Sequence, residues 1–318
     1  MSSIENLRIV FMGTPEFAVA SLDALVSAGC NIVGVITAPD KPAGRGMQLQ
    51  QSAVKKYASE KGLNVLQPEK LKNPEFIEQL KLLRADVQVV VAFRMLPEIV
   101  WNMPPMGTIN VHASLLPQYR GAAPINWAII NGETETGITT FKLQHEIDTG
   151  NILLQEKISI DEKETAGELH DKLKKLGASL IVKTIEGIAN GNIKETPQLT
   201  SATGTHHSPL TIHHAPKLNT ETCKIDWDKP ADVIFNLVRG LSPYPTAFTN
   251  LDDKILKIYF AEKEIAEHHR ETGSVHTDGK TYLKFACANG FIYCTDIQLQ
   301  GKKRMNIQDF LRGYRLNK

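Results

Sequence analysis

The amino-terminal segment constrains the fold most strongly, because it alternates a buried strand, a helix and a second strand. Leu7–Met12 is an unbroken apolar run of strand length, and Phe17–Ala28 has the apolar spacing of a helix that ends at Gly29. Asn31–Thr37, rich in β-branched residues, predicts the next strand. A strand–helix–strand unit of this length favours parallel pairing, so we expect a doubly wound, mostly parallel, Rossmann-like α/β sheet.

The turn after the first strand argues against a nicotinamide enzyme. It reads Gly13-Thr14-Pro15-Glu16 and contains one glycine. The dinucleotide fingerprint needs three glycines, for the tight turn, for the approach of the pyrophosphate and for helix packing. We therefore expect a Rossmann-like sheet that does not bind a dinucleotide cofactor through this turn.

The rest of the chain divides by composition into a continuation of this pattern, a linker and a second domain. We predict a first domain at residues 1–191, a linker rich in Thr, Ser, Gly, Pro and His at 192–217, and a small β-barrel at 218–318, where short strands are separated by turn residues. Within the first domain, helices are predicted at Ser52–Lys61, Pro74–Leu83 and Thr165–Asn190, and strands at Asp86–Ala92, Thr108–Val111, Thr136–Leu143 and Ile152–Ile160.

Composition and charge exclude several classes of protein. The chain has 318 residues, 42% of them hydrophobic, enough for two globular cores. The four cysteines are far apart and show no Cys-x-x-Cys spacing, so neither a disulfide framework nor a zinc site is indicated.

The apolar run near the amino terminus is too short for a signal core or a membrane span. We expect a cytoplasmic protein with no membrane partner. A formal net charge of +1 means that any nucleic-acid contact must come from local patches.

The clearest chemical pattern follows the strand at Thr108–Val111. Side chains on a strand alternate between faces, so Asn110 and His112 project the same way at its carboxyl end, where open α/β sheets bind ligands. Farther along the chain, Asp148 supplies a carboxylate in a turn. An amide donor, an imidazole and an acid are a minimal set for acyl transfer. The alternative is that Asn110 and His112 only end a strand and satisfy nearby backbone groups.

A resemblance to a known family rests on this segment. Asn110-x-His112-x-Ser114-x-Leu116-Pro117-x-x-Arg120-Gly121 resembles the signature of enzymes that use 10-formyltetrahydrofolate, and Asp148 matches their third catalytic residue. The match to these formyltransferases runs almost end to end, and it is strongest with the branch that acts on methionyl-tRNA. The resemblance implies that Asn110, His112 and Asp148 are catalytic. It also implies transfer of a formyl group from 10-formyltetrahydrofolate to the α-amino group of methionyl initiator tRNA. We expect the chain to act as a monomer and without a metal.

The same resemblance implies the binding residues. In the family, the loop that matches Pro42–Gly46 enters the acceptor arm of the tRNA, and Arg45 lies where the family has its key arginine. Phe17 would contact the methionine side chain. The carboxyl-terminal barrel would be an oligonucleotide-binding-type (OB-like) domain that helps to hold tRNA. Met47–Gln50 departs from the family, which often has lysines there. The predicted folate-binding residues are Phe93, Arg94, Met95, Leu96, Ser114, Leu115, Leu116 and Pro117.

Other proteins share parts of this pattern. Glycinamide ribonucleotide formyltransferases share the signature but lack a second domain. Sugar-nucleotide formyltransferases carry extra domains, and the Pro42–Gly46 loop separates this chain from them. A deformylase would use water as the acceptor. A non-catalytic RNA-binding module would have no function for Asn110, His112 and Asp148. A metal site is a weaker alternative, because the candidate ligands are unspaced pairs without carboxylates or cysteines. These are His206, His207, His213 and His214.

Overall fold

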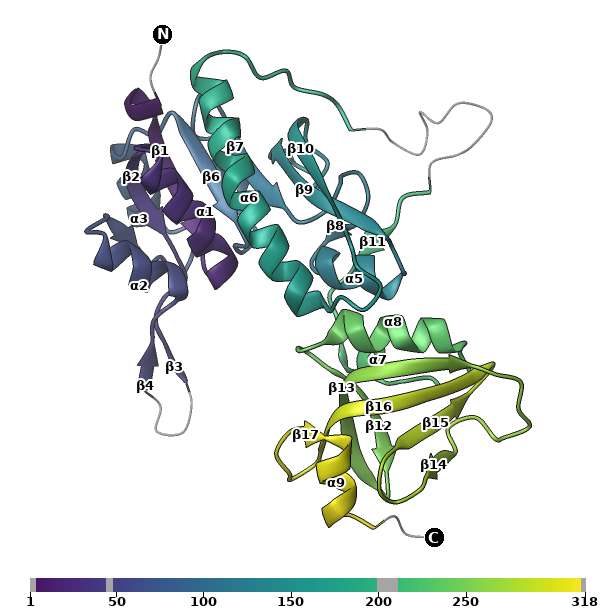
Figure 1. Cartoon of the computed structure of the whole chain (residues 1–318). Coiled ribbons are helices and arrows are strands. Elements are labelled where there is room, and N and C mark those ends of the chain that lie inside the picture. Colours follow the sequence, from purple (N-terminus) through teal and green to yellow (C-terminus); the bar gives the residue numbers. More distant parts are fainter. Residues whose placement is uncertain (1–3, 44–47, 199–210, 316–318) are drawn as a thin grey trace, which may run out of the picture. The chain divides into compact units, whose positions relative to one another are not determined.

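The chain folds into two compact units. The computed structural model describes residues 4–43, 48–198 and 211–315 (Figure 1). Besides its carboxyl-terminal part from residue 215, the second unit includes two segments from the middle of the chain, Gly121–Thr136 and Ser159–Leu169. The first unit comprises the other residues up to His214. The domain limits at residues 191 and 217 remain a prediction from composition.

A seven-stranded sheet forms the centre of the first unit. Its strand order is β10-β9-β7-β6-β1-β2-β5, with parallel pairing from β5 to β7 and an antiparallel step from β7 to β9. Every residue of β6 is buried, as expected for a parallel strand covered on both faces. The prediction of a doubly wound, mostly parallel sheet is confirmed. The strands are β1 (Arg8–Gly13), β2 (Asn31–Ile36), β5 (Val65–Leu66), β6 (Val87–Val91), β7 (Thr108–His112), β9 (Glu135–Lys142) and β10 (Ile152–Ser159).

Helices cover both faces of this sheet. On one face, Val10, Met12 and Val90 form a buried cluster with residues of α3 and α4. On the other, a Cβ added at Gly177 of α6 would lie 3.3 Å from Val111 Cγ1, so α6 packs closely on β7. Figure 1 shows α1 and α6 in front of the sheet. The helices are α1 (Glu16–Ser27), α2 (Ala53–Glu60), α3 (Pro74–Leu82), α4 (Glu98–Trp101) and α6 (Ala166–Ala189).

Several short elements were not predicted from the sequence. Strands β3 and β4 pair antiparallel, with Lys41 opposite Gln50. The β8 and β11 strands lie where the chain passes from one unit to the other. The short elements are η1 (Ile4–Asn6), β3 (Lys41–Ala43), β4 (Gln48–Gln50), β8 (Arg120–Gly121) and β11 (His214–Ala215).

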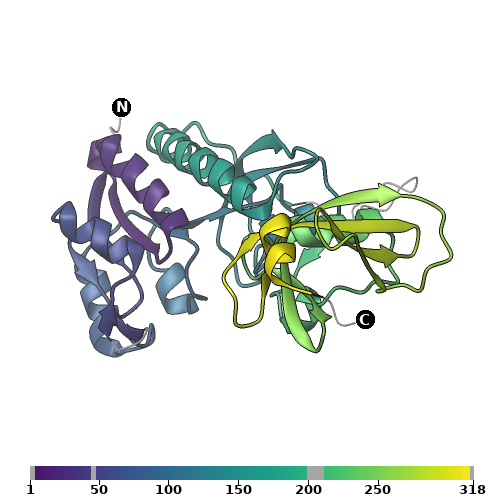
Figure 2. The ribbon, with the colours of Figure 1, turned by 60° about the horizontal axis from the view of Figure 1, so that its bottom comes forward.

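The second unit is built on a curled antiparallel sheet (Figure 2). The paired order runs β12-β13-β16-β15-β14, with β17 added to β16, and among the described residues it does not close into a ring. The small β-domain is therefore a half-barrel rather than a complete barrel, and the apolar side of α8 packs into it. The elements are α7 (Thr220–Cys223), α8 (Ala231–Leu241), β12 (Ala247–Leu251), β13 (Lys254–Ile265), β14 (Val275–Thr277), β15 (Leu283–Cys287), β16 (Gly290–Leu299), β17 (Met305–Asn306) and α9 (Ile307–Gly313).

Helix α5 (Pro124–Ile130) completes the second unit by packing on α8. Asn126 Nδ2 donates a hydrogen bond to the carbonyl of Gly240 at 2.8 Å. A Cβ at Gly240 would lie 2.6 Å from Ile130 Cγ1 and 3.2 Å from the Asn126 carbonyl, so the two helices approach closely because this position has no side chain. Within the described residues, no helix combines the length and apolar character needed to cross a bilayer.

We predict that Gly240→Ala lowers the free energy of unfolding of the second unit by about 1–3 kcal/mol, because the added methyl group overpacks the contact between α5 and α8. Urea denaturation followed by tryptophan fluorescence measures this. Gly313→Ala is the matched control, since a Cβ there meets no atom within 4 Å, and it should be neutral or slightly stabilising. Equal stability of the two variants would contradict the packing argument.

Candidate active site

The carboxyl end of β7 places two polar side chains on one face of the sheet. Asn110 lies opposite Val90 of β6 and Phe141 of β9, and His112 lies opposite Thr139 of β9. Because the register of β6 and β7 pairs Val91 with Val111, the segments that leave these two strands emerge side by side from the same edge. This is the edge at which doubly wound sheets bind ligands.

The imidazole of His112 is buried and has a defined orientation. Its Nε2 lies 2.9 Å from the backbone carbonyl oxygen of Tyr119, and the Phe141 ring packs edge-on with ring centroids 6.4 Å apart. A carbonyl oxygen can only accept a hydrogen bond, so Nε2 must carry the hydrogen. In the neutral imidazole, Nδ1 is then the nitrogen with a free lone pair.

Asp148 faces that nitrogen. His112 Nδ1 and Asp148 Oδ2 are 3.8 Å apart, and the two side chains are 7% and 11% exposed. Asp148 has a φ of +55°, a left-handed conformation that aspartate tolerates better than most residues. Two residues later, a Cβ at Gly150 would lie 1.6 Å from the Lys142 carbonyl oxygen, so only glycine allows this turn to close on β9.

This geometry limits what the pair can do. Neutral Nδ1 and an ionised carboxylate are both hydrogen-bond acceptors, so together they bind a group that carries N–H or O–H. When the imidazole is charged, Nδ1–H becomes a donor itself. The structure thus places His112 and Asp148 in electrostatic contact, and the strand register places Asn110 on the same face of β7 as His112.

The loop after β7 is held by a hydrogen-bond network that the sequence did not reveal. The Thr139 hydroxyl donates to the Ser114 carbonyl at 2.7 Å, and it accepts from Leu116 N at 3.1 Å and from Gln155 Nε2 at 2.9 Å. Ser114 Oγ donates to the Gln118 carbonyl at 2.6 Å. Ser114 and Leu116 are buried, so these predicted folate-binding residues also form part of the packed loop. Leu115 and Pro117 are half-buried.

Four predicted folate-binding residues, Phe93–Leu96, follow β6, and two of them line a cavity. Phe93 and Arg94 line a space of about 440 Å³, whereas Leu96 is buried in the core and Met95 is 75% exposed. Arg94 Nη1 donates to the Glu69 carbonyl at 2.7 Å, and burial lowers the pKa of its guanidinium. The other lining residues are Thr14, Ala38, Pro39, Asp40, Lys41 and Glu69.

The two predicted tRNA residues differ in what the structure says of them. Phe17 is buried, 7% exposed, and its ring meets His170 edge-on at 5.3 Å between centroids. Arg45 lies outside the described residues, as do Met47, His206 and His207.

Among the candidate metal-binding histidines, His213 stacks on Tyr119, with 5.8 Å between the ring centroids. In the part of the chain that is described, no three His, Cys, Asp or Glu side chains are grouped as metal ligands.

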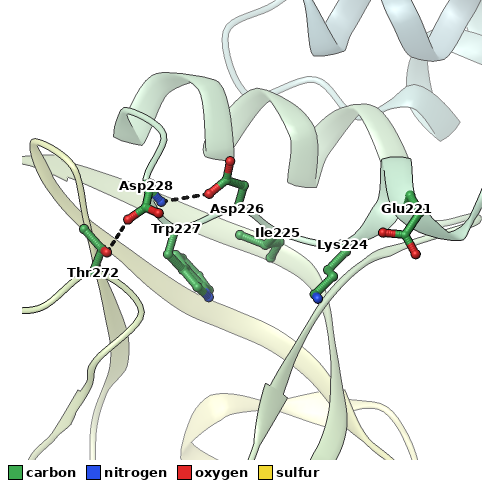
Figure 3. A pocket seen from close by; sticks show the side chains of 7 residues that line it. All are labelled: Glu221, Lys224, Ile225, Asp226, Trp227, Asp228 and Thr272. Atoms are coloured by element: carbon green, nitrogen blue, oxygen red, sulfur yellow. Dashed lines mark hydrogen bonds between the residues drawn. The ribbon is translucent and has the colours of Figure 1, made fainter.

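A second cavity, of about 450 Å³, lies in the second unit (Figure 3). Its lining includes Trp227, whose Nε1 donates to Thr249 Oγ1 at 3.0 Å, and Asp228, which accepts from Thr272. Lys224 and three carboxylates, those of Glu221, Asp226 and Asp228, account for its charged groups. This cavity holds no imidazole, so it lacks the set of groups found at the end of β7.

Comparison with known proteins gives the same family along most of the chain. Residues 7–185 match the family model described as formyl transferase, and residues 217–315 match the formyl transferase C-terminal domain. Methionyl-tRNA formyltransferase of Parabacteroides distasonis is 56% identical over 317 residues, covering 98% of this chain and 97% of the relative. The protein of the same name from Flavobacterium johnsoniae is 52% identical over 314 residues, with the same coverage.

Solved structures share the fold at lower identity. The sugar 3N-formyl transferase WlaRD, crystallised with dTDP and 5-N-formyl-THF, is 23% identical with a TM-score of 0.64, covering 93% of this chain and 99% of its own. HypX from Aquifex aeolicus in complex with tetrahydrofolic acid is 17% identical with a TM-score of 0.61, covering 98% of this chain and 48% of its own.

We predict that Thr139→Val lowers the free energy of unfolding by about 1–3 kcal/mol, because it leaves buried polar groups of the loop unpaired. Urea denaturation measures the loss, and hydrogen exchange should become faster at the Leu116 amide but not at Val111 within the sheet. Thr139→Ser keeps the hydroxyl and should retain most of the stability. A Val variant as stable as the parent would refute the role given to this network.

Proposed function

This chain belongs to the formyl transferase family, and we propose that it transfers a formyl group from 10-formyltetrahydrofolate to the α-amino group of methionyl initiator tRNA. Two observations support the catalytic part of this proposal: the contact between His112 and Asp148, and the position of Asn110 on the same face of β7 as His112, at the carboxyl edge of the sheet. Relatives named methionyl-tRNA formyltransferase, which are similar over almost the whole chain, support the choice of acceptor.

The proposed reaction needs no covalent enzyme intermediate. An α-amine titrates near about pH 7.7, so a useful fraction is neutral and nucleophilic at physiological pH. Formyl transfer forms a bond from the amine nitrogen to the formyl carbon and breaks the bond from that carbon to N10. Between the two events the formyl oxygen carries negative charge. Asn110 N–H and charged His112 are the groups that donate hydrogen bonds to it.

His112 and Asp148 also account for the proton. The amine must lose one proton and N10 must gain one, so the net change at the enzyme is zero. Because Nε2–H is bound to the Tyr119 carbonyl, Nδ1 of the neutral imidazole takes the proton from the amine, donates it as a hydrogen bond to the oxyanion and then gives it to N10. Asp148, 3.8 Å away, stabilises the positive charge while His112 holds it.

The residues available for the folate fit a flat, partly polar ligand. Phe93 and Arg94 give the cavity beyond β6 an aromatic wall and a cationic wall, and the Ser114–Pro117 loop is fixed by the Thr139 network next to the catalytic strand. We assign the pterin to this edge, with Met95, Leu96 and Leu115 in supporting roles. We further propose Arg45 and Phe17 as tRNA contacts, an OB-like tRNA-binding role for the second unit, no metal, and a cytoplasmic monomer.

The second candidate is an amino-sugar nucleotide as acceptor, which the fold shared with WlaRD favours. The level of identity argues against it, since WlaRD is 23% identical and the methionyl-tRNA formyltransferases are above 50%. Glycinamide ribonucleotide is the third acceptor to be tested with the same donor.

One assay separates these candidates. The protein is incubated with 10-formyltetrahydrofolate and, separately, with methionyl initiator tRNA, an amino-sugar nucleotide and glycinamide ribonucleotide, and formyl incorporation is measured. We expect incorporation into the charged tRNA only. Preferential formylation of the sugar nucleotide would replace the proposed function by the second candidate.

We predict that His112→Ala and Asn110→Ala each reduce kcat for formyl transfer by at least about 10²-fold, because each removes a donor to the developing oxyanion. Steady-state kinetics with charged tRNA measures the loss, and circular dichroism checks the fold. His145→Ala is the control: this exposed histidine lies in the same turn as Asp148 and should stay within about threefold of the parent. Parental activity in either catalytic variant would remove the assignment.

A further inference from the structure

We propose that Gln198 is a positioning residue, which sets the distance between Asp148 and His112. The inference rests on the proposed function and deepens it, because it concerns the same site. Gln198 lies in the segment that composition assigned to a linker, and no function was predicted for it.

The side-chain amide of Gln198 binds the main chain of the catalytic turn. Its Nε2 donates to the carbonyl oxygen of Asp148 at 2.9 Å and to that of Gly150 at 2.8 Å. A primary amide has two N–H donors, so both are used on the turn that carries the carboxylate. Gln198 therefore bonds the backbone of Asp148 itself.

The other end of the amide binds the segment that holds the imidazole. Gln198 Oε1 accepts from Arg120 Nε at 3.1 Å and from Nη2 at 2.6 Å. Arg120 directly follows Tyr119, whose carbonyl oxygen accepts the hydrogen of His112 Nε2. One side chain thus connects the backbone that orients His112 with the backbone that carries Asp148.

Arg120 adds a charge to this connection. Burial lowers the pKa of its guanidinium, while the nearby carboxylates of Asp148 and Glu146 act in the opposite direction. The ordinary pKa of arginine is so high that the group stays charged. The hydrogen bonds to Gln198 hold this cation near the carboxylate of Asp148.

Other contacts hold a different part of the turn. Asn151 Nδ2 donates to Glu195 Oε2 at 3.1 Å, and Glu195 also pairs with Lys142 at 2.5 Å. These contacts fix the turn where it rejoins the sheet, at Asn151, three residues after Asp148. The turn can therefore stay folded without Gln198, while the carboxylate shifts relative to the imidazole.

The consequence is a kinetic effect with little change in binding. A misplacement of about 1 Å in a catalytic group costs on the order of 10²-fold in rate. Gln198→Leu should therefore lower kcat by about 10- to 100-fold, with KM for the folate and for the tRNA changed by less than about threefold. Steady-state kinetics with 10-formyltetrahydrofolate and methionyl initiator tRNA measures the three values.

Two further variants separate positioning from general support. Gln198→Glu keeps the size and the contact with Arg120 but loses both donors to the turn, so it should be as slow as Gln198→Leu. Gln118→Leu is the control. The side-chain amide of Gln118 binds the Thr211 carbonyl at 3.0 Å and the His213 amide at 2.9 Å, in the same predicted linker as Gln198, and these hydrogen bonds do not involve the turn of Asp148. This variant should keep kcat within about threefold.

A double-mutant cycle with Asp148→Asn tests whether Gln198 acts through the carboxylate. In the Asp148→Asn background, adding Gln198→Leu should cost less than about threefold, because the group that it positions is already lost. Additive losses would overturn the inference, and so would parental kcat in Gln198→Leu or in Gln198→Glu. Failure of the parent protein to formylate any acceptor would reject the proposed function first, which distinguishes the two outcomes.

Discussion

The hydrogen bond from His112 Nε2 to the Tyr119 carbonyl is the constraint on which the chemistry of this site depends. It fixes the tautomer, so that Nδ1 faces Asp148 at 3.8 Å. Tyr119 itself has a φ of +58°, and its amide donates to the His213 carbonyl at 2.7 Å. The loop after β7 is thus shaped to aim one carbonyl at the imidazole, at the cost of a backbone conformation that non-glycine residues seldom adopt.

The parts of the site come from segments that are far apart in the chain but share one edge of the sheet. Thr139, opposite His112 in β9, supports the loop after β7, and Gln198 returns from beyond α6 to bind the turn of Asp148. Both are buried or half-buried polar residues whose hydrogen-bonding groups are used internally. In our proposal they act on catalysis only through the residues that they hold.

Local sequence patterns predicted what local geometry controls. The alternation of apolar runs gave the parallel sheet, and the two-residue period of a strand placed Asn110 and His112 on one face. Pairings at long range were not predictable in this way. Gln198 lies 50 residues from Asp148 and 48 from Gly150, the two residues whose carbonyls it binds, and its own stretch has the composition of a linker. The pairing of β3 with β4 and the open edge of the half-barrel were likewise not visible in the residues themselves.

The sequence alone determined the alternating strands and helices, the polar pair at the end of β7 and the resemblance to formyltransferases, because each depends on residues close together or on a contiguous motif. Only the tertiary structure decided which imidazole nitrogen faces Asp148, which side chains hold the loop and the turn, and that α5 belongs with α8. These features depend on distances between segments, and a chain specifies such distances only after its cores have packed.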